Sequence, residues 1–129
     1  MSPKRKKNRP PEEDNPYIRS RLIQAINKFN NGEFFECHEI LEDIWFDVRD
    51  DSRDFYQGLL HIAVGLYHLT KKNSEGAIFQ LEKAMGKLRK YENNYSEIDL
   101  LKLLTETENI LSDLKEKKKP QQLPKIIFE

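Results

Sequence analysis

The chain has 129 residues, 37% hydrophobic and 34% charged, which suits one domain with a single core and very polar surfaces. Lysine plus arginine equals aspartate plus glutamate at 22 each, so no global field selects nucleic acid or an acidic membrane as partner. A single cysteine excludes an intramolecular disulfide framework and a cysteine-rich zinc site. Because no leader-like segment is present and no apolar run approaches the ~20 residues of a membrane span, we expect a cytoplasmic protein.

The two ends differ in composition from the middle of the chain. Residues 1–14 contain three prolines, five basic residues and no aliphatic side chain, which predicts a disordered basic arm. Contact of this arm with nucleic acid is a minor alternative, since short terminal basic runs are usually solvated. A helical domain is expected over 15–118 and a C-terminal tail over 119–129. Four apolar residues could hold that tail against the domain: Leu123, Ile126, Ile127 and Phe128.

Two helices are expected in the first part of the domain. Asn15 before Pro16 is a typical cap and first helical position, and it predicts a helix over about 16–30. A second helix is predicted over about 33–49. At 100° per residue His38 lies at the edge of its apolar arc. Three carboxylates point to solvent, Glu36, Asp43 and Asp47, while Cys37 and Trp45 point to the core.

Glu39 and Glu42 lie on one line of the second helix together with Phe35 and Phe46. A line bounded by phenylalanines predicts that both carboxylates sit at a packed boundary. His38 precedes Glu42 by four residues, so the two share a side of the helix. In the simplest interpretation Glu42 or a backbone carbonyl orients the imidazole and a basic residue of another helix pairs with Glu39.

The third helix, about 52–71 with Ser52 as its expected cap, is apolar on most sides. Such a helix belongs in the middle of a bundle. Each internal glycine costs about 1 kcal/mol relative to alanine. Gly58 and Gly65 therefore indicate close approach of another helix or room for a ligand. A narrow polar strip follows this helix, formed by Gln57, His61 and His68.

Two further helices complete the predicted fold. One is expected over about 74–93, capped by Asn73 or Ser74, and one over about 97–117, after a capping-box pattern at Ser96 and Asp99. No strand signal competes. The prediction is an all-α fold, a single compact bundle of about five helices with an apolar central third helix. The buried face expected for the last helix is Leu100, Leu101, Leu104, Ile110, Leu111 and Leu114.

A polar pocket is predicted between the second and third helices, a frequent place for sites in bundles. Imidazole and carboxylate suit zinc, iron or manganese, and the candidate metal ligands are His38, Glu42 and His68. The alternative is that these groups only bond one another or buried water. The HExxH motif is incomplete because glutamate occupies its last position, and the Glu-x-x-His spacing of di-iron bundles is absent. The full candidate set is His38, Glu39, Glu42, Trp45, Gln57, Gly58, His61 and His68.

Three stretches resemble a known family. They are FNNGEFFECHEILEDIW at 29–45, FYQGL with IAVGLYH at 55–68, and NSEGA at 73–77. With these residues the chain resembles the family catalogued as domain of unknown function 309, over about residues 17–114. The resemblance implies a small all-helical single domain and names no activity. It also implies that the motif positions matter, and these are His38, Glu39, Glu42, Trp45, Gln57, Gly58 and His68; His61 is not among them.

Two classes of function follow, with binding placed ahead of catalysis. The first is an interaction module for a protein or small-molecule partner, since the helix pairs have the small and aromatic rhythm of tetratricopeptide-type hairpins without the full consensus. The second is an enzyme or a ligand- or metal-binding protein that uses the His and Glu pocket, with metal-assisted or general-base hydrolysis as its chemistry. The sequence specifies no cofactor, indicates no membrane partner and is compatible with an oligomer.

Overall fold

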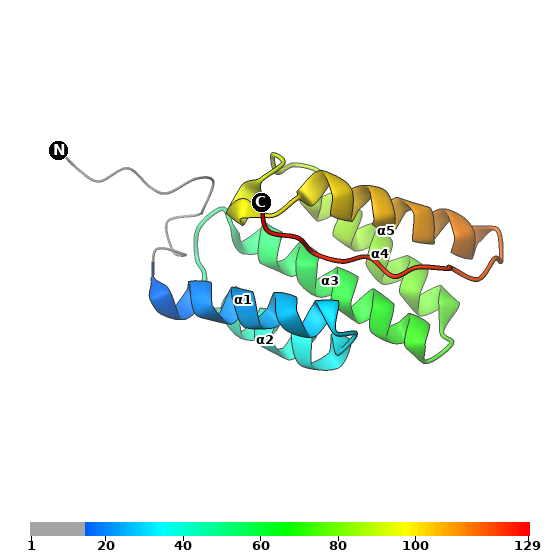
Figure 1. Ribbon diagram of the computed structural model, residues 1–129, viewed down its shortest axis with the longest axis horizontal. Helices are drawn as coiled ribbons and strands as arrows, with labels where there is room; N and C mark the ends of the chain where they lie inside the picture. The colour runs from blue at the N-terminus through cyan, green and yellow to red at the C-terminus, as the bar shows by residue number, and fades with distance from the viewer. Residues whose placement is uncertain (1–14) are drawn as a thin grey trace.

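The computed structural model of the protein describes residues 15–129, so the predicted basic arm lies outside the described part. Within it the fold is all-α, as predicted, and contains five α-helices and a short 3₁₀ turn (Figure 1). These elements are α1 (Pro16–Asn30), α2 (Phe34–Asp47), α3 (Arg53–Thr70), α4 (Ser74–Leu88), η2 (Tyr95–Glu97) and α5 (Leu100–Lys115). None of the helices in this part is long and apolar enough to cross a membrane.

α3 is the centre of the arrangement. It packs against α2 on one side and α4 on the other, while α1 packs on α2 and α5 on α4. α2, α3 and α4 therefore form one layer, and α1 and α5 cover one side of it with the C-terminal tail between them (Figure 1). We call the opposite side of this layer, away from α1, α5 and the tail, the outer face.

The glycines of α3 explain its close approach to α4. A β-carbon added at Gly58 would lie 2.6 Å from Cγ of Leu88, and one at Gly65 would lie 2.8 Å from Cγ of Leu81. Both leucines are fully buried on α4. Of the two explanations offered by the sequence, the structure supports the approach of another helix.

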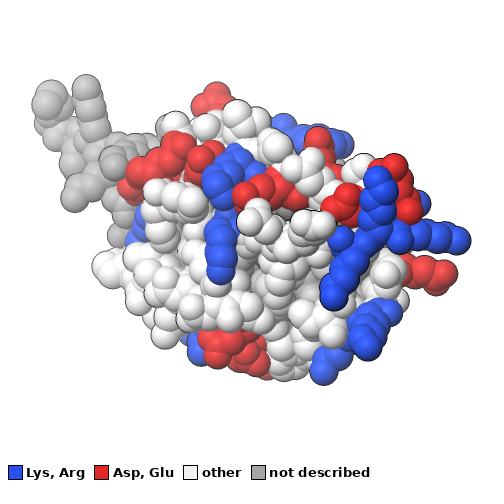
Figure 2. Space-filling model, turned by 45° about the vertical axis from the view of Figure 1, so that its right-hand side comes forward, with Lys and Arg blue, Asp and Glu red and all other residues white. Residues whose placement is uncertain are grey.

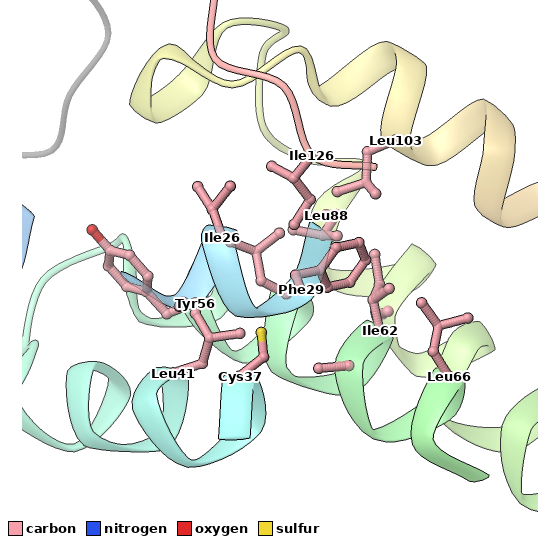
Figure 3. Packing of buried hydrophobic residues seen from close by; sticks show 14 of the residues in the cluster. Ile26, Phe29, Cys37, Leu41, Tyr56, Ile62, Leu66, Leu88, Leu103 and Ile126 are labelled. Atoms are coloured by element: carbon pink, nitrogen blue, oxygen red, sulfur yellow. The ribbon is translucent and has the colours of Figure 1, made fainter. Parts of the chain in front are cut away.

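The core lies between the α2–α3–α4 layer and the helices that cover it. Ile26 and Phe29 of α1 point into it toward Leu88, and Ile126 of the tail closes it from above (Figure 3). Among residues 15–129 Tyr56 is the largest fully buried side chain, and Cys37 also lies in the core.

The helix termini match the predictions in part. Asn15 and Asn73 cap α1 and α4 by accepting from the backbone N–H of Tyr17 and Gly76. Ser52 occupies the N-cap position of α3, as predicted, but its side chain forms no cap hydrogen bond because its hydroxyl donates to the Asp50 carboxylate instead.

The start and the buried face of α5 also differ from the predictions. Asp99, and not Ser96, supplies the cap, since Ser96 has a left-handed backbone and Asp99 Oδ1 accepts from the Lys102 N–H. Leu103 is buried and Leu101 is 65% exposed, so the buried face of α5 continues from Leu103 to Thr107 and Ile110 instead of passing through Leu101.

The tail is fixed to α1 by the side chain of Asn30. Its Nδ2 donates to the Ile126 carbonyl, and its Oδ1 accepts from the Ile126 N–H, both at 2.8 Å. The Asp99 N–H donates to the carbonyl of Ile127 at 2.8 Å, and Arg19 lies 4.9 Å above the ring of Phe128. These contacts bury Ile126 and leave Ile127 at 43% exposure, so the apolar residues of the tail alternate between core and solvent.

Substituting the helical glycines by alanine should change stability in opposite directions. Gly65→Ala should lower the free energy of unfolding by about 1–3 kcal/mol because the new methyl group overpacks against Leu81. Gly86→Ala should raise it by about 0.5–1 kcal/mol, since a β-carbon there meets nothing within 4 Å and alanine favours the helix. Urea unfolding of both variants measures the difference, and equal effects would refute the packing argument.

Removing the clamp on the tail should destabilise the fold. Asn30→Ala leaves the N–H and carbonyl of Ile126 without their partner, which should cost about 1–3 kcal/mol in the free energy of unfolding. Asn27→Ala, an exposed asparagine on the same helix, is the matched control and should change stability by less than about 0.5 kcal/mol. A loss of the same size in both variants would mean that the clamp contributes nothing.

Candidate functional site

His38 is held on α2 by contacts within its own helix. Its Nδ1 lies 3.3 Å from the carbonyl of Phe35, and its Nε2 lies 3.8 Å from the Glu42 carboxylate. The ring also packs against that of Phe35, with centroids 5.5 Å apart. The carbonyl of Phe35 and the carboxylate of Glu42 therefore orient the imidazole, as in the simplest interpretation of the sequence.

Glu39 and Glu42 are solvated rather than set at a packed boundary. Both are exposed, with 58% of the Glu42 side chain accessible. The phenylalanines of the same line are also open, Phe35 at 45% and Phe46 at 64%. The physical reason is that α2 is an outer helix of its layer, with α1 and α3 as its neighbours. Phe35 touches Tyr67 of α3, with ring centroids 5.5 Å apart, while Glu39 and Glu42 remain open to solvent. Within residues 15–129 no basic side chain pairs with Glu39.

His61 faces α4 and not α2. Its Nδ1 lies 2.7 Å from Oε1 of Gln80. Burial lowers the pKa of His61, and the positive charges of Lys83 and Lys87 act in the same direction, while the bond to Gln80 opposes them. A neutral imidazole bonded to an amide is a satisfied packing group in this environment.

The other residues of the strip on α3, Gln57 and His68, share no partner with His38. Nδ1 of His68 lies 3.4 Å from Nδ2 of Asn73, and its ring packs against Gly76. Gln57 is partly exposed, and Gly58 packs on α4. The strip is therefore not turned as a whole toward the helix that carries His38.

Trp45 is half-buried at the edge of the layer instead of deep in the core. The guanidinium of Arg53 lies 4.3 Å above its ring, and Phe46 meets it edge-on at 6.3 Å. A cation–π contact at a partly exposed site stabilises by about 0.5–1 kcal/mol, so Trp45 fixes the start of α3 against the end of α2.

The described residues do not assemble the metal site considered from the sequence. Among residues 15–129 no three His, Cys, Asp or Glu side chains form a group that could hold a metal ion. Cys37 is buried in the core, and this burial raises the pKa of its thiol to about 12. At neutral pH the thiol is protonated and inert. Metal or general-base chemistry at His38, Glu42 and His68 stays a prediction.

Two ion pairs join α4 to the chain of α5. An open hollow of about 510 Å³ lies between α4 and α5. Two ion pairs line it, Lys115 with Glu82 at 2.8 Å and Arg89 with Glu108 at 2.7 Å. Figure 2 shows positive and negative side chains next to one another along the upper part and the right-hand side of the visible face. These paired walls leave no free charged group to select a ligand.

The outer face carries exposed aromatic side chains. Phe35 and Phe46 border it on α2, and Phe79, 58% exposed, borders it on α4. Between them α3 has no charged residue from Phe55 to Thr70, and its strip on this face is partly exposed, comprising Gln57, Leu60, His61, Val64 and His68. Phe79 was not singled out from the sequence. Its signal was present, because it falls opposite the apolar residues that define the buried side of α4.

The fold and these residues define a small all-helical domain with a partly exposed central helix. Residues 22–79, from α1 into α4, match the model of the family described as "Domain of unknown function (DUF309)". This match agrees with the resemblance seen in the sequence, and it includes the paired His38 and Glu42 and the whole of α3.

Two relatives show how far the similarity extends. The uncharacterized protein YpuF of Bacillus subtilis (strain 168) is 41% identical over 62 residues, which is 47% of this chain and 36% of that protein. An uncharacterized protein of Aquifex aeolicus (strain VF5) is 26% identical over 91 residues, 70% of this chain and 27% of that protein. The chain thus spans about a quarter to a third of the length of these curated relatives.

The stability contributed by His61 should depend on pH. Its pKa is lowered in the folded state, so below the ordinary value of about 6.5 the unfolded chain binds more protons than the folded one. The stability that His61 contributes is fully present above the unfolded-state pKa of about 6.5. It is lost as the pH falls from there through the lower pKa of the folded state. The difference in free energy of unfolding between the wild type and His61→Gln should therefore shrink between about pH 7.5 and pH 5. Parallel curves for the two proteins would contradict the prediction.

Proposed function

We propose that the domain is a binding module and that its outer face docks another protein. The observation that carries this proposal is the exposure of Phe35, Phe46 and Phe79 around a strip of α3 that has no charged residue. Exposed aromatic clusters of this kind mark interaction surfaces, because docking removes about 25 cal/mol of unfavourable hydration per Å² of apolar area buried.

The composition of the face agrees with that of protein interfaces. Aromatic side chains are enriched at the centres of such interfaces and carry much of the binding energy. Charged groups form the rim: Glu39 and Glu42 on the edge at α2, and Lys83 and Lys87 on the edge at α4. The paired His38 and Glu42 then serve recognition at this rim, where the imidazole is held in place by Phe35.

Site-specific photocrosslinking tests the proposal. A photoreactive phenylalanine analogue at position 79 or 35, in the full chain inside producing cells, should form one adduct of the same mass at both positions. The control is position 101 on α5, where Leu101 is 65% exposed on the covered side of the layer; it should not form that adduct. Excess unlabelled wild-type protein should suppress the adduct, while Phe35→Ser/Phe79→Ser protein should not.

Two results would argue against docking at the outer face. One is the absence of an adduct at positions 35 and 79 under conditions in which the analogue reacts. The other is the same set of adducts at position 101, which would indicate collisions unrelated to this face.

A further inference from the structure

The outer face has opposite charges on its two edges. α2 contains five acidic residues and no lysine or arginine, and Glu39 and Glu42 border the outer face. On α4 the same face is bordered by Lys83, whose Nζ lies 4.7 Å above the ring of Phe79. Within residues 15–129 neither Glu39 nor Lys83 forms an ion pair, so both charges are available to a partner.

The opposite charges lie at the same height along the layer. Phe35 of α2 contacts Tyr67 near the end of α3, and Trp45 contacts Arg53 at its start, so α2 and α3 are antiparallel. His61 of α3 contacts Gln80, and α4 runs in the same direction as α2 (Figure 1). Counting along the helices from these contacts places Lys83 between the levels of Glu39 and Glu42.

We propose that the partner of the outer face is a second copy of this chain, which rests on the proposed function of that face. A twofold axis parallel to α3 places α2 of each copy over α4 of the other. Lys83 of one copy then lies opposite Glu39 and Glu42 of its partner, and the contact occurs twice by symmetry. The exposed phenylalanines are buried between the two layers.

The centre of the face suits such an axis. At a twofold axis residues meet their own counterparts, so a charge there would be repelled by its copy. α3 has no charged residue over the part that would lie on the axis, where Leu60 and Val64 are partly exposed. An axis perpendicular to the helices would instead oppose α2 with α2 and bring Glu42 against Glu42, so the charge pattern selects the parallel axis.

Charge reversal and mixing of purified full-length proteins test the dimer. Sedimentation equilibrium of the wild type should show a monomer–dimer equilibrium. Glu39→Lys/Glu42→Lys and Lys83→Glu should each raise the dissociation constant at least about tenfold, because each opposes like charges in both symmetric contacts. Mixed in equal amounts, the two variants should recover the wild-type dissociation constant, since both contacts then pair opposite charges.

Recovery of dimerisation on mixing would show that the variants had lost a contact between copies and had not misfolded, because mixing cannot repair a defect within one chain. Glu108→Lys, a charge reversal on α5 outside the outer face, is the control and should dimerise like the wild type. The inference is overturned if the wild type is monomeric up to about 1 mM, or if the mixture dimerises no better than its components.

The crosslinking experiment distinguishes failure of the dimer from failure of the proposed function. An adduct at position 79 with twice the mass of the chain supports both proposals. An adduct with a different protein, together with a monomeric wild type, overturns the dimer but still supports the proposal that the outer face docks another protein. Absence of any adduct at positions 35 and 79 overturns both.

Discussion

The contact between α3 and α4 determines the shape of this protein. Two glycines on α3 lie so close to buried leucines of α4 that a methyl group in place of either glycine hydrogen would clash with them. This contact draws one side of α3 against α4, and the uncharged strip that includes Leu60 and Val64 is left on the outer face. Since α1, α5 and the tail all lie on the other side, the strip remains partly exposed despite the apolar sequence of α3.

The same arrangement separates the residues that looked like one site. His38 belongs to α2 and is paired within that helix, while His61 is drawn to Gln80 by the approach of α4. His68 lies by the cap of α4, near Asn73. The three histidines therefore have separate environments, and what unites them is the face that they share rather than a common pocket.

That shared face changes the balance between the two classes of function. A catalytic or metal site needs several polar groups converging on one point, and within residues 15–129 the candidate ligands do not converge. A docking surface needs exposed apolar area with a charged rim. Phe35 and Phe79 supply the first, and Glu42 and Lys83 supply the second. The proposed binding function follows from this difference in what each kind of site requires.

The sequence by itself determined the helices, two of the side-chain caps and most of the core, because helical period and capping chemistry are local properties of the chain. It also placed His38 beside Glu42, four residues apart on one helix. Only the tertiary structure decided that His61 meets Gln80, that Glu39 is solvated and that Asn30 holds the tail. The period of a helix gives the angle of each side chain about its own axis, whereas the neighbour found at that angle depends on how the helices pack against one another.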